Sequence, residues 1–341
     1  MKSIPVQDAV GSVLCHDITE IVPGVCKGPA FRRGHVIQPE DVEHLLRLGK
    51  EHLYVWEEED GMVHEDEAAY RIAKAIAGKG LVYGEPKEGR INFSAAHRGL
   101  FSLNLELLDR LNSIPHITIA TIHTLQGVAK GRNVAGTRVI PLSVPESSLT
   151  AVEGCCKNDP LLSVLPFEPQ RIGIVTTGSE VFSGRIKDGF GPVLRKKLST
   201  LDVSVLDQRF VPDDSEQTAT AIEGFLDDGA TMVVVTGGMS VDPDDKTPGA
   251  IKSVASEVVG YGAPVFPGAM FMVAYKGDVP ILGLPGCVMY HKASIFDVLL
   301  PRLLAGVRLT RRDILSLAHG GFCEGCPECH YPACGFGKAL F

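Results

Sequence analysis

The sequence predicts an α/β protein whose largest domain has a mainly parallel sheet covered on both faces, with smaller α+β domains towards the N-terminus. Two observations carry this prediction. Between residues 168 and 306, a short apolar strand, a turn and a helix follow one another four times, which is the pattern of a parallel sheet. The chain has 341 residues, more than one average hydrophobic core organises, so two or three domains are expected.

Changes in composition divide the chain into four segments. The acidic run 57–60, followed by Gly61, indicates the first boundary. Cys155–Cys156 and the prolines that follow predict a linker before the α/β domain. The last segment is too short to fold by burial alone. The expected segments are an N-terminal segment at 1–62, a mixed α/β or β-rich middle domain at 63–166, the α/β domain at 168–306 and a cysteine-rich tail at 307–341.

The elements of the first two segments are predicted from caps, apolar runs and turn residues. Pro39 in a first turn and Gly49 after the last predict a helix that ends at Leu48. Glycines between valines predict a small hairpin-rich unit in the middle domain. The expected ranges are a strand at 52–56, helices at 66–77 and 104–111, a strand at 117–122 and the hairpin-rich unit at 127–141.

The α/β domain is expected to alternate strands with helices. Asp213, Asp214 and Ser215 predict one helix N-terminus and Thr247–Pro248 predicts another, because capping side chains and proline are favoured there. In a parallel sheet, ligands bind at the carboxyl ends of the strands. The expected strands are 171–177, 203–210, 231–236 and 279–284, and the expected helices are 192–201, 215–227, one that begins at 247 and a long one at 290–304.

Glycines and hydroxyl residues follow three of these strands and are candidate ligand-binding residues. A glycine after a strand permits a positive φ or the close approach of a ligand, and main-chain N–H groups with hydroxyls can bind phosphate. Each motif alone could be an ordinary strand–helix turn, but their repetition after successive strands favours a site. The candidates are Thr177, Gly178 and Ser179, then Gly237, Gly238 and Ser240, then Pro285 and Gly286.

Carboxylates occur at the same strand ends. Glu180 follows the first motif, and Asp188 lies in a loop before the next helix, where it could orient a ligand hydroxyl or amide. Asp242, Asp244 and Asp245 place three carboxylates within four residues, which is costly unless a cation neutralises them. Oxygen ligands of this kind suit Mg²⁺, which usually keeps waters and bridges to phosphates. The alternative for this run is a solvated acidic loop.

The tail carries four of the nine cysteines at short spacing. The pattern Cys-x2-Cys-x2-Cys-x4-Cys predicts a four-thiolate metal site that holds either tetrahedral Zn²⁺ or a [4Fe–4S] cluster. The spacing does not choose between these metals, and a free, oxidisable tail is the alternative. A disulfide scaffold is disfavoured because such scaffolds spread their cysteines through small secreted chains. The expected metal ligands are Cys323, Cys326, Cys329 and Cys334.

Residues 170–305 resemble the molybdopterin-binding domain. This domain is shared by molybdopterin molybdenumtransferases (MoeA-like), molybdopterin adenylyltransferases (MogA-like) and CinA-like proteins. The resemblance rests on the motifs above, in order, together with Pro267–Gly268, and residues 5–14 also look like the start of a MoeA-like chain. It implies a three-layer αβα domain and a Mg²⁺-dependent insertion of molybdate into the dithiolene of adenylylated molybdopterin, with release of AMP.

The resemblance also implies roles for the candidate residues. By position, Glu180, Asp188 and Asp245 are expected to be catalytic, and Asp242 is expected to join the glycine and hydroxyl residues in binding the pterin, Mg²⁺ or molybdate. Two other functions stay open. The first is a non-catalytic molybdenum cofactor carrier or redox-sensing protein, and the second is a molybdopterin adenylyltransferase, because the loop around Asp188 is closer to the MogA-like pattern.

Charge and hydropathy set the expected partners and location. The net charge of −8 disfavours broad nucleic-acid binding, and no apolar stretch reaches about 18 residues, so no membrane span is expected. Residues 1–10 lack the apolar core of a signal peptide, which favours a cytoplasmic protein. The expected partners are the pterin, a molybdoenzyme or another cofactor-biosynthesis protein, and a second copy in a homodimer.

Overall fold

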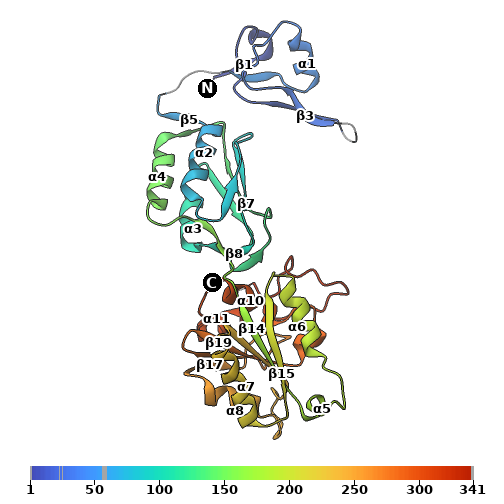
Figure 1. Ribbon diagram of the computed structural model, residues 1–341. Coiled ribbons are helices and arrows are strands. Elements are labelled where there is room, and N and C mark those ends of the chain that lie inside the picture. Colours follow the sequence, from blue (N-terminus) through green and yellow to red (C-terminus); the bar gives the residue numbers. More distant parts are fainter. Residues whose placement is uncertain (1, 23, 25, 56–59, 339–341) are drawn as a thin grey trace. The chain divides into compact units, whose positions relative to one another are not determined.

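The computed structural model describes residues 2–338, except 23, 25 and 56–59. The contacts within the chain divide it into two compact units (Figure 1). Each unit is described by itself. Unit 1 consists of Met1–Ala96, Leu103–Ile122 and Gly131–Ser163, and unit 2 consists of His97–Ser102, His123–Lys130 and Val164–Phe341.

A six-stranded sheet forms the centre of unit 2. Its first four strands in sheet order run parallel, and its last two are antiparallel at one edge. All residues of the central strand β16 are buried, as expected for a strand with both faces covered. In sheet order the strands are β15 (Ser204–Val211), β14 (Arg171–Thr177), β16 (Met232–Thr236), β19 (Val279–Leu284), β18 (Met272–Lys276) and β17 (Glu257–Tyr261).

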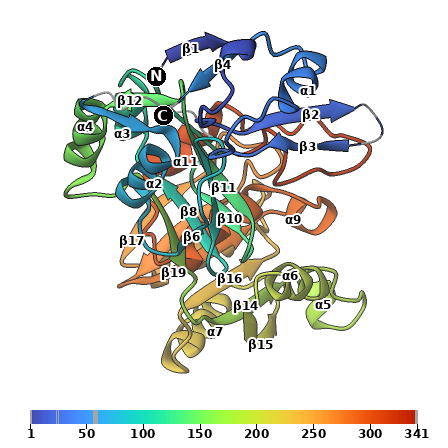
Figure 2. The ribbon, with the colours of Figure 1, turned by 90° about the horizontal axis from the view of Figure 1, so that it is seen from above.

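Helices cover both faces of this sheet. Ile172 and Ile174 of β14 pack in one hydrophobic cluster with α6 and α10, whereas Val175 packs in a second cluster with α7 and α8. Figures 1 and 2 show α6 and α7 on opposite sides of β14 and β15. The predicted three-layer αβα arrangement is therefore confirmed. The helices are α6 (Phe190–Ser199), α7 (Ser215–Asp227), α8 (Thr247–Val254) and α10 (Ile295–Leu304).

Unit 2 corrects two expectations. The long helix expected at 290–304 is wrong, because a short helix α9 (Cys287–Tyr290) is followed by a new start at α10. That start is a capping box in which the Asp297 carboxylate accepts a hydrogen bond from the N–H of Ser294 at 2.8 Å. The antiparallel strands β17 and β18 were absent from the expected pattern. Two further short helices are α5 (Ser179–Phe182) and α11 (Arg311–Leu315), followed by a 3-10 turn at Ser316–Ala318.

The linker expected after Cys155–Cys156 and the hairpin-rich unit expected at 127–141 are both wrong. The two cysteines end helix α4 (Glu146–Cys156), and the prolines flank a strand, β13 (Leu162–Pro166). This strand joins β8 (Gly99–Leu103) and β10 (Gln126–Val128) in the order β10-β8-β13. The glycines around residue 130 therefore separate strands that pair with different partners.

Unit 1 contains a four-stranded antiparallel sheet with one covered face. Along its strands, Ile91, Phe93 and Ile119 are buried while their neighbours are exposed, because successive side chains point to opposite faces. The helices α2 (Glu65–Ile76) and α3 (Leu105–Asn112), predicted within one residue, lie with α4 on the covered face. The strands in sheet order are β6 (Leu81–Tyr83), β7 (Arg90–Ala95), β11 (Asn133–Val139) and β9 (Ile117–Thr121).

The N-terminal part of unit 1 has a small core of its own, formed by residues such as Val6, Leu14 and Leu45. Gly49, at φ +74°, follows helix α1 (Asp41–Arg47), as predicted. Trp56 of the expected strand and most of the acidic run lie outside the described residues. The paired strands are β1 (Lys2–Pro5) with β4 (His52–Val55), β2 (Ile18–Val22) with β3 (Cys26–Phe31), and β5 (Met62–His64) with β12 (Ser143–Pro145). Within the described ranges, no helix is long and apolar enough to cross a membrane.

Candidate functional site

The sequence-predicted motifs of unit 2 meet at one edge of its sheet. The strands β14, β16 and β19 are neighbours and run parallel, so their carboxyl ends lie side by side. Thr177 ends β14, Thr236 ends β16 and Leu284 ends β19, and the glycine turns follow directly. This edge is where ligands of parallel sheets bind.

Four buried threonines connect the turns after β14 and β16. The Thr236 hydroxyl donates to Thr176 Oγ1 at 3.2 Å. Thr247 Oγ1 donates to the Gly237 carbonyl at 2.9 Å and lies 3.2 Å from Thr177 Oγ1. Because the single proton of Thr247 is used on Gly237, Thr177 acts as the donor in the second contact. All four residues are at most 5% exposed, so hydrogen bonds among buried hydroxyls hold the two turns together.

The two glycines after β16 are required for two reasons: their φ angles are positive, and atoms of Thr177 and Thr247 lie very close to them. Gly237 has φ +86°, and a Cβ there would lie 2.2 Å from the Thr177 carbonyl oxygen. Gly238 has φ +53°, and its Cβ would lie 2.9 Å from Thr247 Oγ1. At Gly237 a side chain would meet the main chain of the neighbouring turn, and at Gly238 it would meet the Thr247 hydroxyl, so both positions favour glycine. The result is a narrow cradle of main-chain atoms, here called the glycine cradle (Gly237–Gly238 against Thr177).

The turn after β14 is held by Asp213, which sequence analysis had assigned to a helix cap. Asp213 accepts a hydrogen bond from the N–H of Ser179 at 2.8 Å, and Ser179 Oγ accepts one from the N–H of Asp213 at 3.3 Å. The capping residue of α7 is Asp214, whose carboxylate accepts from Gln217 N–H at 2.8 Å. Glu180 is exposed, and its carboxylate lies over Gly178.

Asp188 is anchored by protein donors. Its Oδ1 accepts from the N–H of Phe190 at 2.9 Å, at the start of α6, and its Oδ2 accepts from Gln208 Nε2 at 2.7 Å. The same Gln208 nitrogen donates to Thr176 Oγ1 at 3.0 Å. Gln208 therefore ties the loop before α6 to the threonine network. Gln208 was not predicted from the sequence, because it lies inside β15 and only its polar side chain marks it. Thr176, Thr236 and Thr247 lie in the predicted motifs and at a predicted helix start, but they were not among the candidate site residues.

The acidic loop after the glycine cradle contributes one carboxylate to the site. Asp245 Oδ2 accepts from the N–H of Ser240 at 2.8 Å, while its Oδ1 lies near Gly238. Tyr261 donates from its hydroxyl to the Met239 carbonyl at 2.7 Å. The pKa of Tyr261 is raised by burial and further by the negative charge of Asp245. Asp242 is exposed and accepts a bond from Asp245 only through its carbonyl.

The third motif lies against the loop that contains Asp188. Pro285 is buried, Gly286 is exposed, and α9 begins at the next residue. A Cβ on Gly189 would lie 2.5 Å from Met289 Sδ, so α9 packs directly on the start of α6. Burial raises the pKa of Cys287, which keeps this thiol protonated and argues against a nucleophile.

Neither the tail cysteines nor the strand-end carboxylates form a ready-made metal-binding group among the described residues. In the described part of the chain, no group of three or more His, Cys, Asp or Glu side chains could hold a metal ion. A protein-only cage for Mg²⁺ is thus lacking there, but Mg²⁺ commonly binds through one or two carboxylates together with substrate phosphates. The free Oδ1 side of Asp245, near the glycine cradle, fits that mode.

The cysteine-rich tail covers an unpaired buried charge. Cys326 and Cys329 are exposed, whereas Cys323 and Cys334 are partly buried against the core of unit 2. The tail packs on α10, because the Tyr331 hydroxyl donates to the Asp297 carbonyl at 2.9 Å. Arg302 of α10 is 3% exposed, and its Nε and Nη1 lack a partner among the described residues. Burial lowers the pKa of Arg302, and such an unpaired charge is costly.

Comparisons with known proteins agree with the resemblance for unit 2. Residues 173–305 match the family model described as a probable molybdopterin binding domain, and residues 3–57 match one described as a domain of unknown function (DUF8806). A molybdopterin molybdenumtransferase of Synechococcus elongatus is 27% identical over 43% of this chain and 38% of its own length. A CinA-like protein of Syntrophus aciditrophicus is 37% identical over 24% of this chain and 19% of its own length. The chain thus spans well under half the length of these relatives.

Two solved structures resemble part of the chain. The molybdopterin biosynthesis enzyme MoaB from Thermus thermophilus has a TM-score of 0.35 and 22% identity, and covers 40% of this chain and 97% of its own. The tungsten cofactor synthesizing protein MoaB from Pyrococcus furiosus has a TM-score of 0.34 and 20% identity, and covers 42% of this chain and 99% of its own. The predicted resemblance to the molybdopterin-binding domain is confirmed for residues 173–305 by the family match.

Proposed function

We propose that the chain acts in molybdenum cofactor biosynthesis. In this proposal, unit 2 binds molybdopterin or its adenylate at the carboxyl ends of β14, β16 and β19, and molybdate is inserted with Mg²⁺. The observation that carries the proposal is the glycine cradle, whose close approach to Thr177 excludes any side chain. It lies within the segment that matches the molybdopterin-binding domain.

The ligand would be held by neutral groups and positioned by carboxylates. Main-chain N–H groups of the glycine cradle, with the hydroxyls of Ser179 and Ser240, are suited to a phosphate or its adenylate. Asp245 and Asp242 would hold Mg²⁺, which when bound neutralises phosphate and molybdate charge. Glu180 would act beside Gly178, and Asp188 would position the loop before α6 through Gln208. Preorganised dipoles of this kind favour a reaction by stabilising developing charge.

Two other functions each have an observation in their favour. A non-catalytic cofactor carrier is favoured because three carboxylates do not converge at the strand ends of the described unit 2. A molybdopterin adenylyltransferase is favoured by the firm anchoring of the loop that contains Asp188, through Phe190 and Gln208.

Asp245→Asn is expected to lower AMP release from molybdopterin-AMP by about 10- to 100-fold in the presence of Mg²⁺ and molybdate. The amide can still accept the bond from Ser240 N–H, so the loop should stay folded, but it loses the negative charge. Asp244→Asn, an exposed neighbour, is the matched control and should leave the rate unchanged. Pterin retained without AMP release would indicate the carrier, and adenylylation of molybdopterin by ATP would indicate the adenylyltransferase. Absence of both pterin binding and AMP release would overturn the proposal.

We also propose that Cys323, Cys326, Cys329 and Cys334 bind Zn²⁺ or a [4Fe–4S] cluster. The supporting observation is that Nε and Nη1 of the buried Arg302 guanidinium lack a partner among the described residues, because a four-thiolate metal site carries net negative charge that a buried cation offsets. Tyr331 lies near both the tail cysteines and Arg302. Burial raises its pKa most strongly, Cys334 and Cys329 raise it further, and the charge of Arg302 lowers it.

Elemental analysis and absorption spectra of protein purified without oxygen test this metal site. We expect about one structural metal site per chain, lost in Cys326→Ser and Cys329→Ser and retained in Cys287→Ser, which lies outside the tail. Iron with inorganic sulfide would identify the cluster, and zinc alone would identify the tetrahedral site. Protein that is metal-free after such a purification, or that binds the same metal in all three variants, contradicts the assignment.

A further inference from the structure

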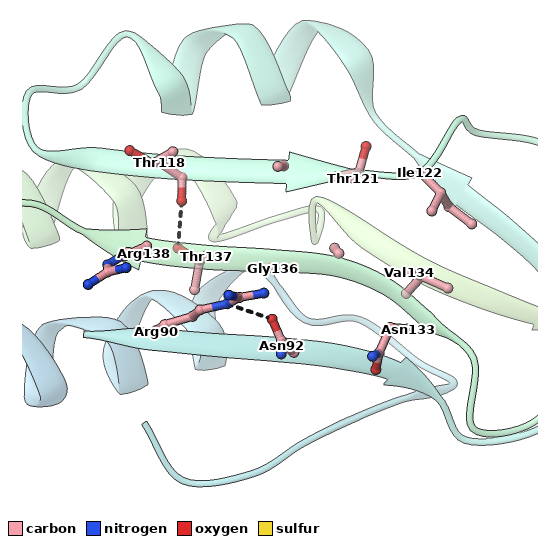
Figure 3. Close-up of a pocket in the computed structure, with 12 residues that line it drawn as sticks. Arg90, Asn92, Thr118, Thr121, Ile122, Asn133, Val134, Gly136, Thr137 and Arg138 are labelled. Atoms are coloured by element: carbon pink, nitrogen blue, oxygen red, sulfur yellow. Dashed lines mark hydrogen bonds between the residues drawn. The ribbon is translucent and has the colours of Figure 1, made fainter. Parts of the chain in front are cut away.

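The sheet of unit 1 has one face that its helices leave uncovered. A hollow of about 410 Å³ lies on this face, over β7, β11 and β9 (Figure 3). Most of the residues that line it are polar or small, and Ile122 and Val134 add apolar side chains. The residues that matter most are Arg90, Asn92, Thr118, Ala120, Gly136 and Arg138.

Two arginines come from directly opposite strand positions at one end of this hollow, and their guanidinium groups point in different directions (Figure 3). In the register of the sheet, Arg138 of β11 is directly opposite Arg90 of β7 and, on its other side, Thr118 of β9. Like charges directly opposite on neighbouring strands destabilise a sheet. None of the described residues that line the hollow is acidic. The pair is therefore an unfavourable arrangement for the sheet alone, in a chain whose net charge is −8.

Among the residues that the structure describes, neither Arg90 nor Arg138 forms a salt bridge. Arg138 does act on Glu65 of α2, because it lowers the pKa of that carboxyl against the larger rise that burial causes. Arg90 donates from Nε to Asn92 Oδ1 at 3.0 Å, which directs the guanidinium across the sheet toward β11 (Figure 3). Across the described ranges, arginine ion pairs are formed instead by Arg33, Arg71, Arg98, Arg209 and Arg308.

The floor of the hollow is kept open by small residues. Gly136 lies between Asn92 and Ala120 in the register of β11 with its two neighbours. Its φ is not in the left-handed region, so the backbone does not require glycine there. Glycine inside a strand costs stability and often marks a site of close approach by a ligand. A Cβ at Gly136 would lie 3.0 Å from Asn92 Oδ1 and would begin to fill the hollow.

We propose that this face binds a small ligand that carries a phosphate group. Arg90 and Arg138, which are on neighbouring strands at this end of the hollow, supply the positive charge and the N–H donors for the phosphate oxygens, because guanidinium groups bind phosphate well. The organic part of the ligand lies over Gly136 and Ala120, where the Asn92 amide nitrogen is a donor. The site belongs to unit 1, is independent of the strand-end site in unit 2, and does not rest on the function proposed above.

Calorimetric titration of the full chain with ribose 5-phosphate, inorganic phosphate and ribose tests the proposal. We expect both phosphates to bind and ribose not to bind. Arg90→Gln and Arg138→Gln should each raise the Kd for ribose 5-phosphate about 10-fold or more, while Arg47→Gln, an exposed arginine of α1, should not change it. Gly136→Val should weaken ribose 5-phosphate more than inorganic phosphate, because only the sugar needs the floor.

Folding and site identity are checked with the same variants. Arg138→Gln should keep or raise the thermal midpoint, because it removes a like-charge pair, so lost binding would not reflect unfolding. The proposal is overturned if ribose 5-phosphate does not bind, or if its Kd is unchanged in both arginine variants. The proposal is also overturned if a single-stranded oligonucleotide binds more tightly than ribose 5-phosphate and its binding depends on the same two arginines. The ligand would then be an extended polyanion.

Discussion

Gly237→Ala is expected to abolish binding of molybdopterin and to lower the free energy of unfolding of unit 2 by about 2–5 kcal/mol. Two penalties add. The φ of +86° is unfavourable for alanine, and the new Cβ would lie 2.2 Å from the Thr177 carbonyl, which must then move. Movement of this carbonyl also disturbs Thr247, which hydrogen-bonds the Gly237 carbonyl. Pterin fluorescence measures binding, and urea unfolding followed by circular dichroism measures stability.

Gly249→Ala is the matched control for this change. Gly249 lies in α8, only 12 positions along the chain, and nothing lies within 4 Å of a Cβ placed there. Alanine should therefore raise stability, by about 0.5–1 kcal/mol, because glycine is unfavourable inside a helix. Opposite signs in the two variants would identify the positive φ and the close approach at Gly237 together as the cause. Equal pterin binding in Gly237→Ala and the unmodified chain would refute the role of the glycine cradle.

Glu65→Gln is expected to stabilise unit 1 at pH 8 and to have little effect near pH 4.5. Burial raises the pKa of Glu65 from 4.5 to about 7, and the neighbouring charge of Asp66 adds to the rise. A folded-state pKa above the unfolded one means that the folded chain binds the proton more tightly. Stability therefore falls as pH rises from about 4.5 to beyond 7, by up to about 3 kcal/mol. Glutamine mimics the protonated acid and removes this loss.

Urea unfolding of both proteins at pH 5 and pH 8 measures the difference. Glu67→Gln supplies the control, because Glu67 is an exposed glutamate on the same helix. The side chain of Glu65 is 6% exposed and lies against Gly89, so a residue of equal size is needed to avoid a cavity. A Glu65→Gln chain that is less stable than the original at pH 8 would show that the carboxylate is charged and paired.

Local signals predicted much of unit 2. The strands at 171–177 and 279–284 were placed at their observed bounds, because each is a short apolar run that ends in Gly or Pro. The N-terminus of α7 was also placed correctly, since the side chain of Asp214 caps it. These features depend on neighbours in sequence, which a single chain displays directly.

Features that depend on sheet order could not be predicted in the same way. β17 has exposed and half-buried residues without a clear alternation, so its pairing with β18 has little local signal. Gln208 and Asp213 reach the site only because β15 is the neighbour of β14. Asp188 was expected to be catalytic, and its anchoring to Gln208 became visible only once these strands were adjacent. The catalytic roles of Glu180, Asp188 and Asp245 stay predictions.

The buried threonine network should keep the site in the same geometry at different pH values. Hydroxyls of Thr177, Thr236 and Thr247 neither gain nor lose protons in the range where proteins stay folded. The two turns should therefore keep their spacing when the pH changes. A change of ligand affinity with pH would then report a change in charge, for example of the ligand, rather than a change in the framework of the site. The dependence of ligand affinity on pH would therefore reflect changes in charge and not a change in the conformation of the two turns.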